Sequence, residues 1–524
     1  MGEKRFKDPV YGYITIDAAV VDQVIDSAAF QRLKNIRQTS YVPLYHAALH
    51  NRFVHSLGVY YLGKKTMEQL EHSDLFQQLP QKEEIRKTFL LACLLHDVGH
   101  APFSHSGEEF YNAAQITADM VQQVADEQFK KDVTALTKTA ANHEIMSVVV
   151  ALRKFGELLP KKEFFARCIT GYTYQNGLTQ EKKTLNCLIG LLNSSLIDVD
   201  RLDYIIRDAF VTGFQSVSID FERLIRGIDL KLYAGEPRLV YHKSALSVIE
   251  NVIYAHDAER KWIQSHPAVL YEQVLIQSAI RAIEKHLQQR APKRKLFAYE
   301  TLTEEGSQFG EISIKLLADE DILWLMKNVC PSSISEEYYA RNKRRHPLWK
   351  SEAEYCTIFD AALGQEALNK LDDDFDRISR FLIAHTGQPI LDDSVWELCD
   401  TQIKNYELVQ KYINEVDYRN GVAAAKHVMR WAEQLKQFTE ENQIPFDFLI
   451  ICTKRFTSGF RKAELEQMLI DFPQLDKMKP IREVSDLLTA ADKRKSFFYL
   501  FCRRGKEELN IKALGRRLRM IAVE

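Results

Sequence analysis

The stretch LLACLLHDVGHAPFSH, residues 90–105, constrains this chain more than any other feature. An apolar run with helical spacing ends abruptly in His96 and Asp97. Neighbouring side chains on a helix point about 100° apart, so these two reach one common point only near the helix end. Gly99 and Pro102 predict that end. The stretch therefore predicts a helix that delivers an imidazole and a carboxylate to the edge of a core.

Two further residues turn this pair into a candidate metal site. His55 lies early in an expected helix upstream, and Asp200 lies on another expected helix downstream. Each residue alone is more typical of a satisfied or solvated side chain, and it is the set of four that favours a metal. Two imidazoles and two carboxylates suit a divalent cation, and they do not choose among manganese, iron, zinc, nickel and magnesium.

The periodicity of the first half of the chain is mainly helical. Apolar residues recur at three- and four-residue spacing in five segments, residues 29–38, 55–72, 83–97, 143–156 and 196–210. A short alternating piece, YGYITID (11–17), predicts a hairpin strand. The fold expected here is therefore a mainly α, all-helical core.

The character of the chain changes after the basic, proline-containing segment 288–297. The aromatic and β-branched runs 446–456 and 495–504 predict strands beside a helix at 423–438. We therefore expect a domain at 1–290 and a smaller α+β lobe at 291–524 for assembly or regulation.

Composition restricts the class of protein. Lys and Arg total 70 against 72 Asp and Glu, for a net charge of −2, which argues against a surface coated in positive charge for nucleic acid. The basic segments 340–350 and 503–520 carry aromatic residues nearby, but such runs are more often solvated surface, so nucleic-acid binding is not favoured. The eight cysteines form no CxxC pair, and we see neither a secretory signal nor a membrane-spanning stretch, so a cytoplasmic protein without a membrane partner is expected.

The motifs resemble those of a known family. KDPVYGYI, AFQRLKNIRQ, HNRFVHSLGV, LLHDVGHAPFSH, NHEIMS and DVDRLDYIIRDA follow the order found in the HD-domain deoxynucleoside triphosphate (dNTP) triphosphohydrolases, the family of the SAM-and-HD-domain enzyme and its bacterial relatives. The resemblance is strong over residues 4–215 and thin but continuous beyond. It implies a divalent metal on His55, His96, Asp97 and Asp200. It also implies hydrolysis of a dNTP to deoxynucleoside and inorganic triphosphate by attack at the α-phosphorus.

The resemblance also implies roles for individual residues. The catalytic residues would be His100, His143 and Glu108. The substrate-binding residues would be Arg52, Gln38, His105, Arg201, Tyr204, Asp208 and Tyr271. A guanine-nucleotide activator site would use Asp26, Gln31 and Lys34.

The chain departs from the family at several of these places. Lys34 stands where the animal enzyme has Arg, and Lys lacks the bidentate fork of Arg. Glu108 replaces an Asp, and Thr39 replaces a Leu beside the sugar. The segment 259–273 aligns poorly with the helix that grips the triphosphate, so the resemblance does not choose among Arg260, Lys261 and His266 for that task.

Three functions stay open at this point. The first is dNTP triphosphohydrolysis, with a dNTP as substrate, GTP or a dNTP as activator, and a homodimer or homotetramer as the assembly. The second is an HD phosphohydrolase acting on a monophosphate, a cyclic nucleotide or an oligonucleotide end. The third is a non-catalytic nucleotide-sensing or nucleic-acid-binding scaffold, against which the full ligand set counts. Control of dNTP pools or defence against phage would be the biological purpose of the first.

Overall fold

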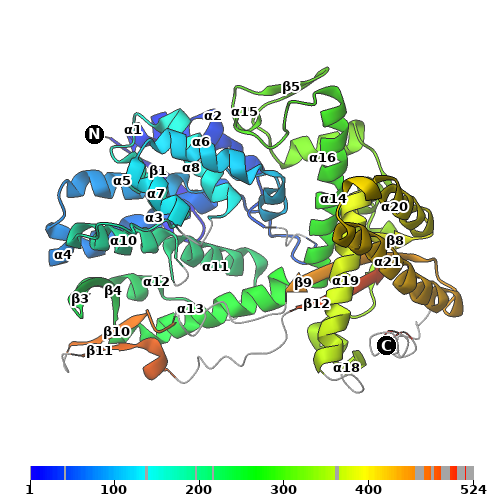
Figure 1. Ribbon diagram of the computed structural model, residues 1–524. Coiled ribbons are helices and arrows are strands. Elements are labelled where there is room, and N and C mark those ends of the chain that lie inside the picture. Colours follow the sequence, from blue (N-terminus) through cyan, green and yellow to red (C-terminus); the bar gives the residue numbers. More distant parts are fainter. Residues whose placement is uncertain are drawn as a thin grey trace. The chain divides into compact units, whose positions relative to one another are not determined.

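The computed structural model divides the chain into two compact units (Figure 1). It describes residues 2–39, 43–135, 140–194, 197–214, 218–359, 365–454, 465–473, 477–485, 496–503, 514 and 518, without the side chains of 365–367, 454 and 496. Unit 1 comprises residues 1–260, 284–325 and 458–490, and unit 2 comprises residues 261–283, 326–457 and 491–524. The expected domains 1–290 and 291–524 stay a prediction.

Helices dominate unit 1. Its longer helices are α3 (Arg52–Leu70), α5 (Lys82–Leu95), α6 (Ala113–Val124), α7 (Glu127–Ala135), α8 (Asn142–Phe155), α9 (Lys162–Thr170), α10 (Gln180–Leu192), α11 (Val199–Thr212) and α13 (Leu246–Glu259). Shorter ones are α1 (Ala18–Val20), α2 (Ala28–Gln31), α4 (Asp74–Gln77), α12 (Phe221–Arg226) and α15 (Tyr299–Leu302).

Local sequence fixes where the site-bearing helices begin. The Asn51 side chain accepts a hydrogen bond from the amide of Val54 and caps α3, and Asp198 does the same for the amide of Arg201 and caps α11. The pattern of buried residues then sets the packing: α5 packs against α3 and α9, α11 packs against α3, and α8 packs against α6 and α9. The starts of α3 and α11 thereby meet the end of α5.

Small sheets complete unit 1. The predicted N-terminal hairpin is present as the antiparallel pair β1 (Glu3–Asp8) and β2 (Gly12–Asp17). A second sheet has the order β11-β10-β4-β3, from β3 (Ile228–Tyr233), β4 (Glu236–His242), β10 (Leu469–Phe472) and β11 (Lys477–Pro480). A third is the pair β5 (Ser307–Phe309) and β6 (Ile312–Ile314). Local sequence patterns predicted neither of these two sheets.

Unit 2 is a mixed α+β body. Its sheet has the order β7-β12-β9-β8, from β7 (His346–Pro347), β8 (Ile390–Asp392), β9 (Asp447–Lys454) and β12 (Ser496–Cys502). Its helices are α17 (Ser333–Tyr339), α18 (Glu352–Phe359), α19 (Gln365–Thr386), α20 (Val395–Val409) and α21 (Glu415–Glu441). Two more helices, α14 (Pro267–Arg290) and α16 (Asp319–Asn328), contain residues of both units. The predicted fold class, mainly α with an α+β lobe, is confirmed.

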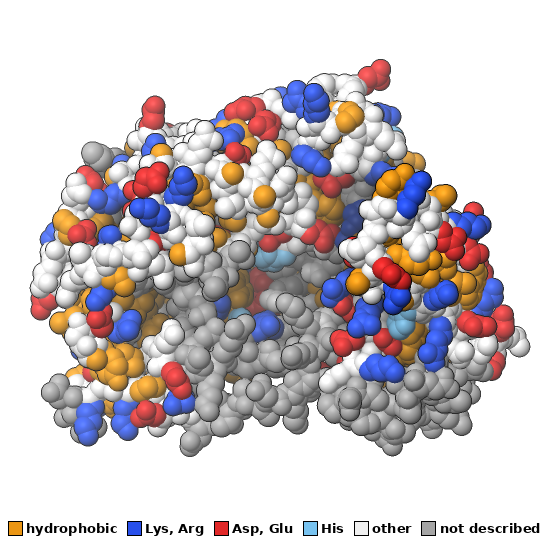
Figure 2. Space-filling view, in the orientation of Figure 1, with side chains coloured by type: hydrophobic (Ala, Val, Ile, Leu, Met, Phe, Trp, Pro, Cys, Tyr) orange, Lys and Arg blue, Asp and Glu red, His pale blue; other side chains and the backbone are white. Residues whose placement is uncertain are grey.

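The basic segment 340–350 is not a free cationic surface. Arg344 forms an ion pair with Glu272, and the buried Arg345 pairs with Glu337 and Asp447. Most of the second basic segment, 503–520, lies outside the described residues. On the face that Figure 2 shows, blue and red side chains are interspersed among the described residues. Among those residues, we also find no helix with the length and apolarity that a bilayer crossing requires.

Candidate metal and acid–base centre

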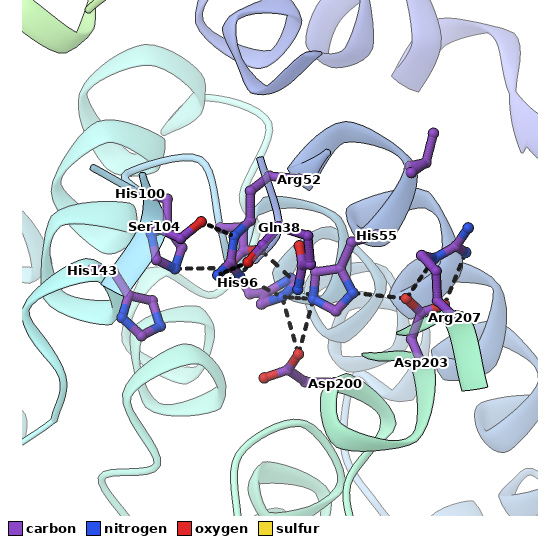
Figure 3. A network of polar contacts seen from close by, with 12 residues as sticks. Gln38, Arg52, His55, His96, His100, Ser104, His143, Asp200, Asp203 and Arg207 are labelled. Atoms are coloured by element: carbon purple, nitrogen blue, oxygen red, sulfur yellow. Dashed lines mark hydrogen bonds and ion pairs between the residues drawn. The ribbon is translucent and has the colours of Figure 1, made fainter. Parts of the chain in front are cut away.

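Three of the four predicted metal ligands, His55, His96 and Asp200, have ligand atoms within 4.8 Å of one another in unit 1, and Asp97 lies beside them (Figure 3). The Nε2 atom of His55, from the first turn of α3, lies 3.3 Å from the Nε2 atom of His96, at the end of α5. An Asp200 oxygen, from the first turn of α11, lies 3.0 Å and 3.6 Å from these two nitrogens. The Asp97 carboxylate lies 3.7 Å from His55 and 3.5 Å from His96.

The second nitrogen of each imidazole shows that the cluster suits a cation. The Nδ1 atom of His96 lies 2.9 Å from the carbonyl oxygen of Cys93, which only accepts, so Nδ1 carries the proton and Nε2 presents a lone pair. The Nδ1 atom of His55 donates in the same way to Asp203, at 2.7 Å. Two lone pairs and two carboxylates therefore face one another, an arrangement that a divalent metal would satisfy.

The pKa values in the cluster also indicate a site that favours a positive charge. Burial lowers the pKa of His55, but hydrogen bonds to Asp200 and Asp203 raise it to about 9. Burial raises the pKa of Asp97, but Arg52 and the histidines bring it down to about 2. The carboxylates are thus ionised, and a proton or a metal is held between them.

A buried chain of ion pairs orients His55 from behind. Asp203 pairs with Arg207 one turn further along α11, at 2.9 Å, and Arg207 pairs with Asp8 of β1, also at 2.9 Å. Gly58 of α3 makes room for this chain, because a Cβ atom there would lie 1.9 Å from an Asp203 oxygen. The salt bridge between Asp203 and Arg207 is therefore buried, and it supports the metal cluster.

Arg52 places a fixed positive charge beside the cluster. Its guanidinium donates to Asp97 at 2.8 Å, to the Ser104 hydroxyl at 2.9 Å and to the carbonyl of Gln38 at 3.3 Å. The side chain is buried. The amide oxygen of Gln38 is also buried and has no hydrogen-bond partner among the described residues, so it is available to a ligand.

A second cluster of imidazoles adjoins the first. One Glu108 oxygen lies 2.6 Å from Nδ1 of His105 and 2.7 Å from Nδ1 of His143, which is the second residue of α8. The His143 ring stacks on His100 with ring centroids 4.2 Å apart, and His100 lies 3.8 Å from Asp97. Asn142 does not cap α8 with its side chain, which donates instead to the carbonyl of Glu108.

The electrostatics of the second cluster separate its two stacked histidines. Burial lowers the pKa of His143, but the Glu108 carboxylate outweighs burial and raises it to about 9. Burial and the positive charge of Arg52 hold the pKa of His100 well below its ordinary value. His143 therefore carries a proton at neutral pH, while His100 is neutral. These residue types could also hold a metal, since their ligand atoms lie within 4.8 Å of one another.

Three of the predicted substrate residues lie along α11. Arg201 follows the ligand Asp200 directly and donates to the Ser194 carbonyl at 3.4 Å. Tyr204 lies one turn further along the same helix and is half-buried. Asp208 is buried and lies 2.6 Å from the imidazole of His50. His50 was not among the predicted site residues, although its position two residues before Arg52 was a usable signal.

Tyr271 belongs to unit 2, whereas the other predicted substrate residues belong to unit 1. Its hydroxyl hydrogen-bonds Glu337 and accepts the amide of Arg345 at 3.0 Å. Its predicted role near the sugar stays a prediction.

The three predicted activator residues lie close together in sequence and belong to unit 1. Asp26 is exposed and 3.6 Å from Lys4, and Gln31 donates to the carbonyl of Ile25 at 2.7 Å. Lys34 is exposed and lies over the ring of Phe53, 4.7 Å from its centroid. Nothing in this arrangement tests nucleotide binding, so the activator site also stays a prediction.

Comparison with known proteins gives the class to which this site belongs. Residues 52–184 match the HD domain family, which identifies this part of the chain as an HD domain. The match includes His55, His96 and Asp97, and the structure adds Asp200 from outside the matched range.

The relatives that resemble the chain include proteins with and without a named activity. The uncharacterized protein YwfO of Bacillus subtilis is 31% identical over 290 residues, which are 54% of this chain and 57% of that protein. The deoxynucleoside triphosphate triphosphohydrolase SAMHD1 of Gallus gallus is 25% identical over 328 residues, which are 59% of this chain and 50% of that protein. The aligned part thus spans only about half to three fifths of these relatives.

A solved structure supports the fold over the whole length. A phosphohydrolase from Bacteroides thetaiotaomicron superimposes with a TM-score of 0.56 at 20% identity, and the superposition covers 96% of this chain and 100% of that one. At this identity the likeness concerns the fold alone.

Proposed function

We propose that this protein hydrolyses dNTPs to deoxynucleoside and inorganic triphosphate. One observation carries the proposal: four candidate metal ligands lie together beside the fixed charge of Arg52 and next to the ion pair of the protonated His143 with the Glu108 carboxylate. Phosphoester cleavage needs a nucleophile, neutralised phosphate charge and a proton for the leaving oxygen, and these groups provide for all three. The resemblance to the SAMHD1 triphosphohydrolases favours a dNTP as substrate.

The metal cluster accounts for the first two requirements. A divalent ion on His55, His96, Asp97 and Asp200 would supply an activated water and would neutralise an α-phosphate oxygen. Asp97 and Ser104 hold Arg52 in one rotamer, so its guanidinium would bind a phosphate with little loss of side-chain entropy.

The second cluster accounts for the proton. His143 stays protonated up to about pH 9 and can protonate the 5′-oxygen as its bond to the α-phosphorus breaks. Glu108 keeps that imidazole charged and oriented. The neutral His100 stacks against it between Asp97 and Glu108 and can accept a hydrogen bond from the attacking water.

Recognition of the sugar is part of the proposal. The amide oxygen of Gln38, which has no hydrogen-bond partner among the residues that the structure describes, and the buried carboxylate of Asp208 are acceptors of the kind that would bind a 3′-hydroxyl. Regulation is also part of the proposal. GTP or a dNTP would activate the enzyme by binding at Asp26, Gln31 and Lys34, and the active form would be a homodimer or homotetramer.

The test is product analysis with the full chain. Purified protein is mixed with each dNTP and Mn²⁺ or Mg²⁺, with and without GTP, and the products are resolved by ion-exchange chromatography. Inorganic triphosphate is expected, whereas orthophosphate alone would instead support an HD phosphohydrolase of another specificity. Asp200→Asn should abolish turnover and metal retention, and His385→Ala, which removes an imidazole of α19 in unit 2, should change neither.

A further inference from the structure

Asp319 is a buried carboxylate that holds two distant segments of unit 1 together. It is the first residue of α16 and lies outside the residues that match the HD domain. One of its oxygens accepts the amide of Arg37 at 3.0 Å, and the other accepts the amide of Phe103 at 2.6 Å. A buried carboxylate with one backbone donor on each oxygen fixes both segments relative to itself.

Both segments lead to the guanidinium of Arg52. Gln38, the residue after Arg37, gives its carbonyl to one nitrogen of Arg52. Ser104, the residue after Phe103, gives its hydroxyl oxygen to another, and the same hydroxyl donates to the Arg37 carbonyl at 2.5 Å. Asp319 therefore binds the residues that directly precede Gln38 and Ser104, which provide two of the three groups that hold Arg52.

The loop that carries Ser104 needs such support. Phe103 and Ser104 have φ angles of 56° and 52°, in the left-handed region that residues other than glycine adopt only at an energetic cost. Two such residues in succession persist when surrounding contacts over-determine them. The hydrogen bond from Phe103 to Asp319 is one of those contacts.

A second contact ties the same loop to the segment before α16. The buried Arg32 donates to the carbonyl of Leu317 at 2.7 Å and to the carbonyls of Val98 and His100 at 3.0 Å and 2.9 Å. Residues 317–319 thus hold the loop that follows His96-Asp97 at both of its ends. The nearby Asp321 makes no such link to the loop, since among the hydrogen bonds described it accepts only the amide of Ala318.

We propose that Asp319 is a positioning residue that fixes Arg52 for contact with a phosphate. The inference rests on the proposed function for the identity of the phosphate. It assigns to α16, outside the HD domain match, a part in the phosphate site.

The test measures phosphate affinity without turnover. Inorganic triphosphate is titrated calorimetrically into the full chain loaded with Mn²⁺, and metal content is measured on the same samples. Asp319→Asn keeps the shape but replaces one acceptor oxygen by a donor, so it should weaken triphosphate binding by about 10- to 100-fold with unchanged metal content. The matched control is Asp321→Asn, which should bind triphosphate as the wild type does, and Asp319→Glu, with both oxygens kept, should recover part of the loss.

A double-mutant cycle separates positioning from general stability. If Asp319 acts through Arg52, then Asp319→Asn should cause no further loss of affinity in an Arg52→Ala background. Hydrogen exchange of the Arg37 and Phe103 amides should also accelerate in Asp319→Asn. Additive losses, or unchanged affinity and exchange in Asp319→Asn, would overturn the proposal. Failure of the wild type to cleave dNTPs while it still binds triphosphate would count against the proposed function alone.

Discussion

At the scale of single residues, the decisive group is the Glu108 carboxylate, since one of its oxygens faces two imidazoles. Burial alone would leave His143 neutral at pH 7, and Glu108 reverses that outcome. The proton stays on His143 below about pH 9 and is lost above it. If His143 acts as the general acid, the rate should fall along an alkaline limb near pH 9.

Glu108→Gln is expected to move that limb to lower pH. The glutamine keeps the size of the side chain but removes the charge, so burial then dominates and the pKa of His143 falls below its ordinary value of about 6.5. The measurement is the pH dependence of kcat with saturating metal. Glu109→Gln, a charge change at the neighbouring residue, should leave the limb in place. An unchanged alkaline limb in Glu108→Gln would exclude His143 as the acid.

The candidate site residues could be predicted from the sequence because their side chains have a distinctive chemistry. Imidazoles and carboxylates such as His55 and Asp200 are rare enough in apolar helices to be noticed, and the motif order grouped them. Asp319 could not be found in that way, because its contacts are backbone amides of Arg37 and Phe103, and backbone donors leave no signature in the sequence.

At the scale of elements, the contact of α3 with α11 depends on Gly58. A methyl group at this position would lie 1.9 Å from Asp203 and 2.4 Å from Arg207, both buried and paired. Asp203 and Arg207 cannot move apart easily to make room for the methyl group, because their separation would leave an uncompensated buried charge. The glycine is therefore required by close approach and not by its backbone angles.

Gly58→Ala is expected to destabilise the protein and to weaken metal binding. Breaking a buried ion pair costs about 3–5 kcal/mol, and displacing Asp203 also releases the orientation of His55. Urea unfolding followed by circular dichroism measures the first effect, and Mn²⁺ titration measures the second. Gly190→Ala in α10 is the matched control, since its Cβ would meet only Ser194 at 4.0 Å. That change should stabilise by about 0.5–1 kcal/mol. Equal free energies of unfolding in both variants would contradict this account.

Periodicity predicted most of the elements around the site. The segments 55–72, 83–97 and 143–156 correspond to α3, α5 and α8 within a few residues. The sheet β11-β10-β4-β3 was missed because β10 pairs in parallel with β4 across more than two hundred residues of sequence, and local patterns carry no information on such pairing. Gly99 and Pro102 predicted the end of the helix that carries His96, and α5 ends at Leu95. The sequence did not predict that Gly99 also permits the close approach of α8, where its Cβ would lie 2.3 Å from the amide nitrogen of Ser147.

At the scale of the whole molecule, all four candidate metal ligands belong to unit 1, although α3, α11 and the segment directly after α5, which carry them, are far apart in sequence. An unfolded chain does not hold these side chains together, so a metal bound by them would be linked to the folding of unit 1. Four of the five tryptophans, in contrast, belong to unit 2: Trp262, Trp349, Trp396 and Trp431. Tryptophan fluorescence therefore reports mainly on the unit that has no part in the metal cluster.

Metal removal should accordingly act on one unit. Treatment with a chelator is expected to lower the free energy of unfolding of unit 1 by about 2.7 kcal/mol relative to Mn²⁺ at 100 times its Kd, because the ion binds the folded state. Calorimetry and far-UV circular dichroism should show a transition that moves with metal, whereas the tryptophan fluorescence transition moves less. Asp200→Asn should melt at one temperature with and without Mn²⁺. Equal shifts in both probes would show that the units unfold together, and no shift in either would contradict a metal site on His55, His96, Asp97 and Asp200.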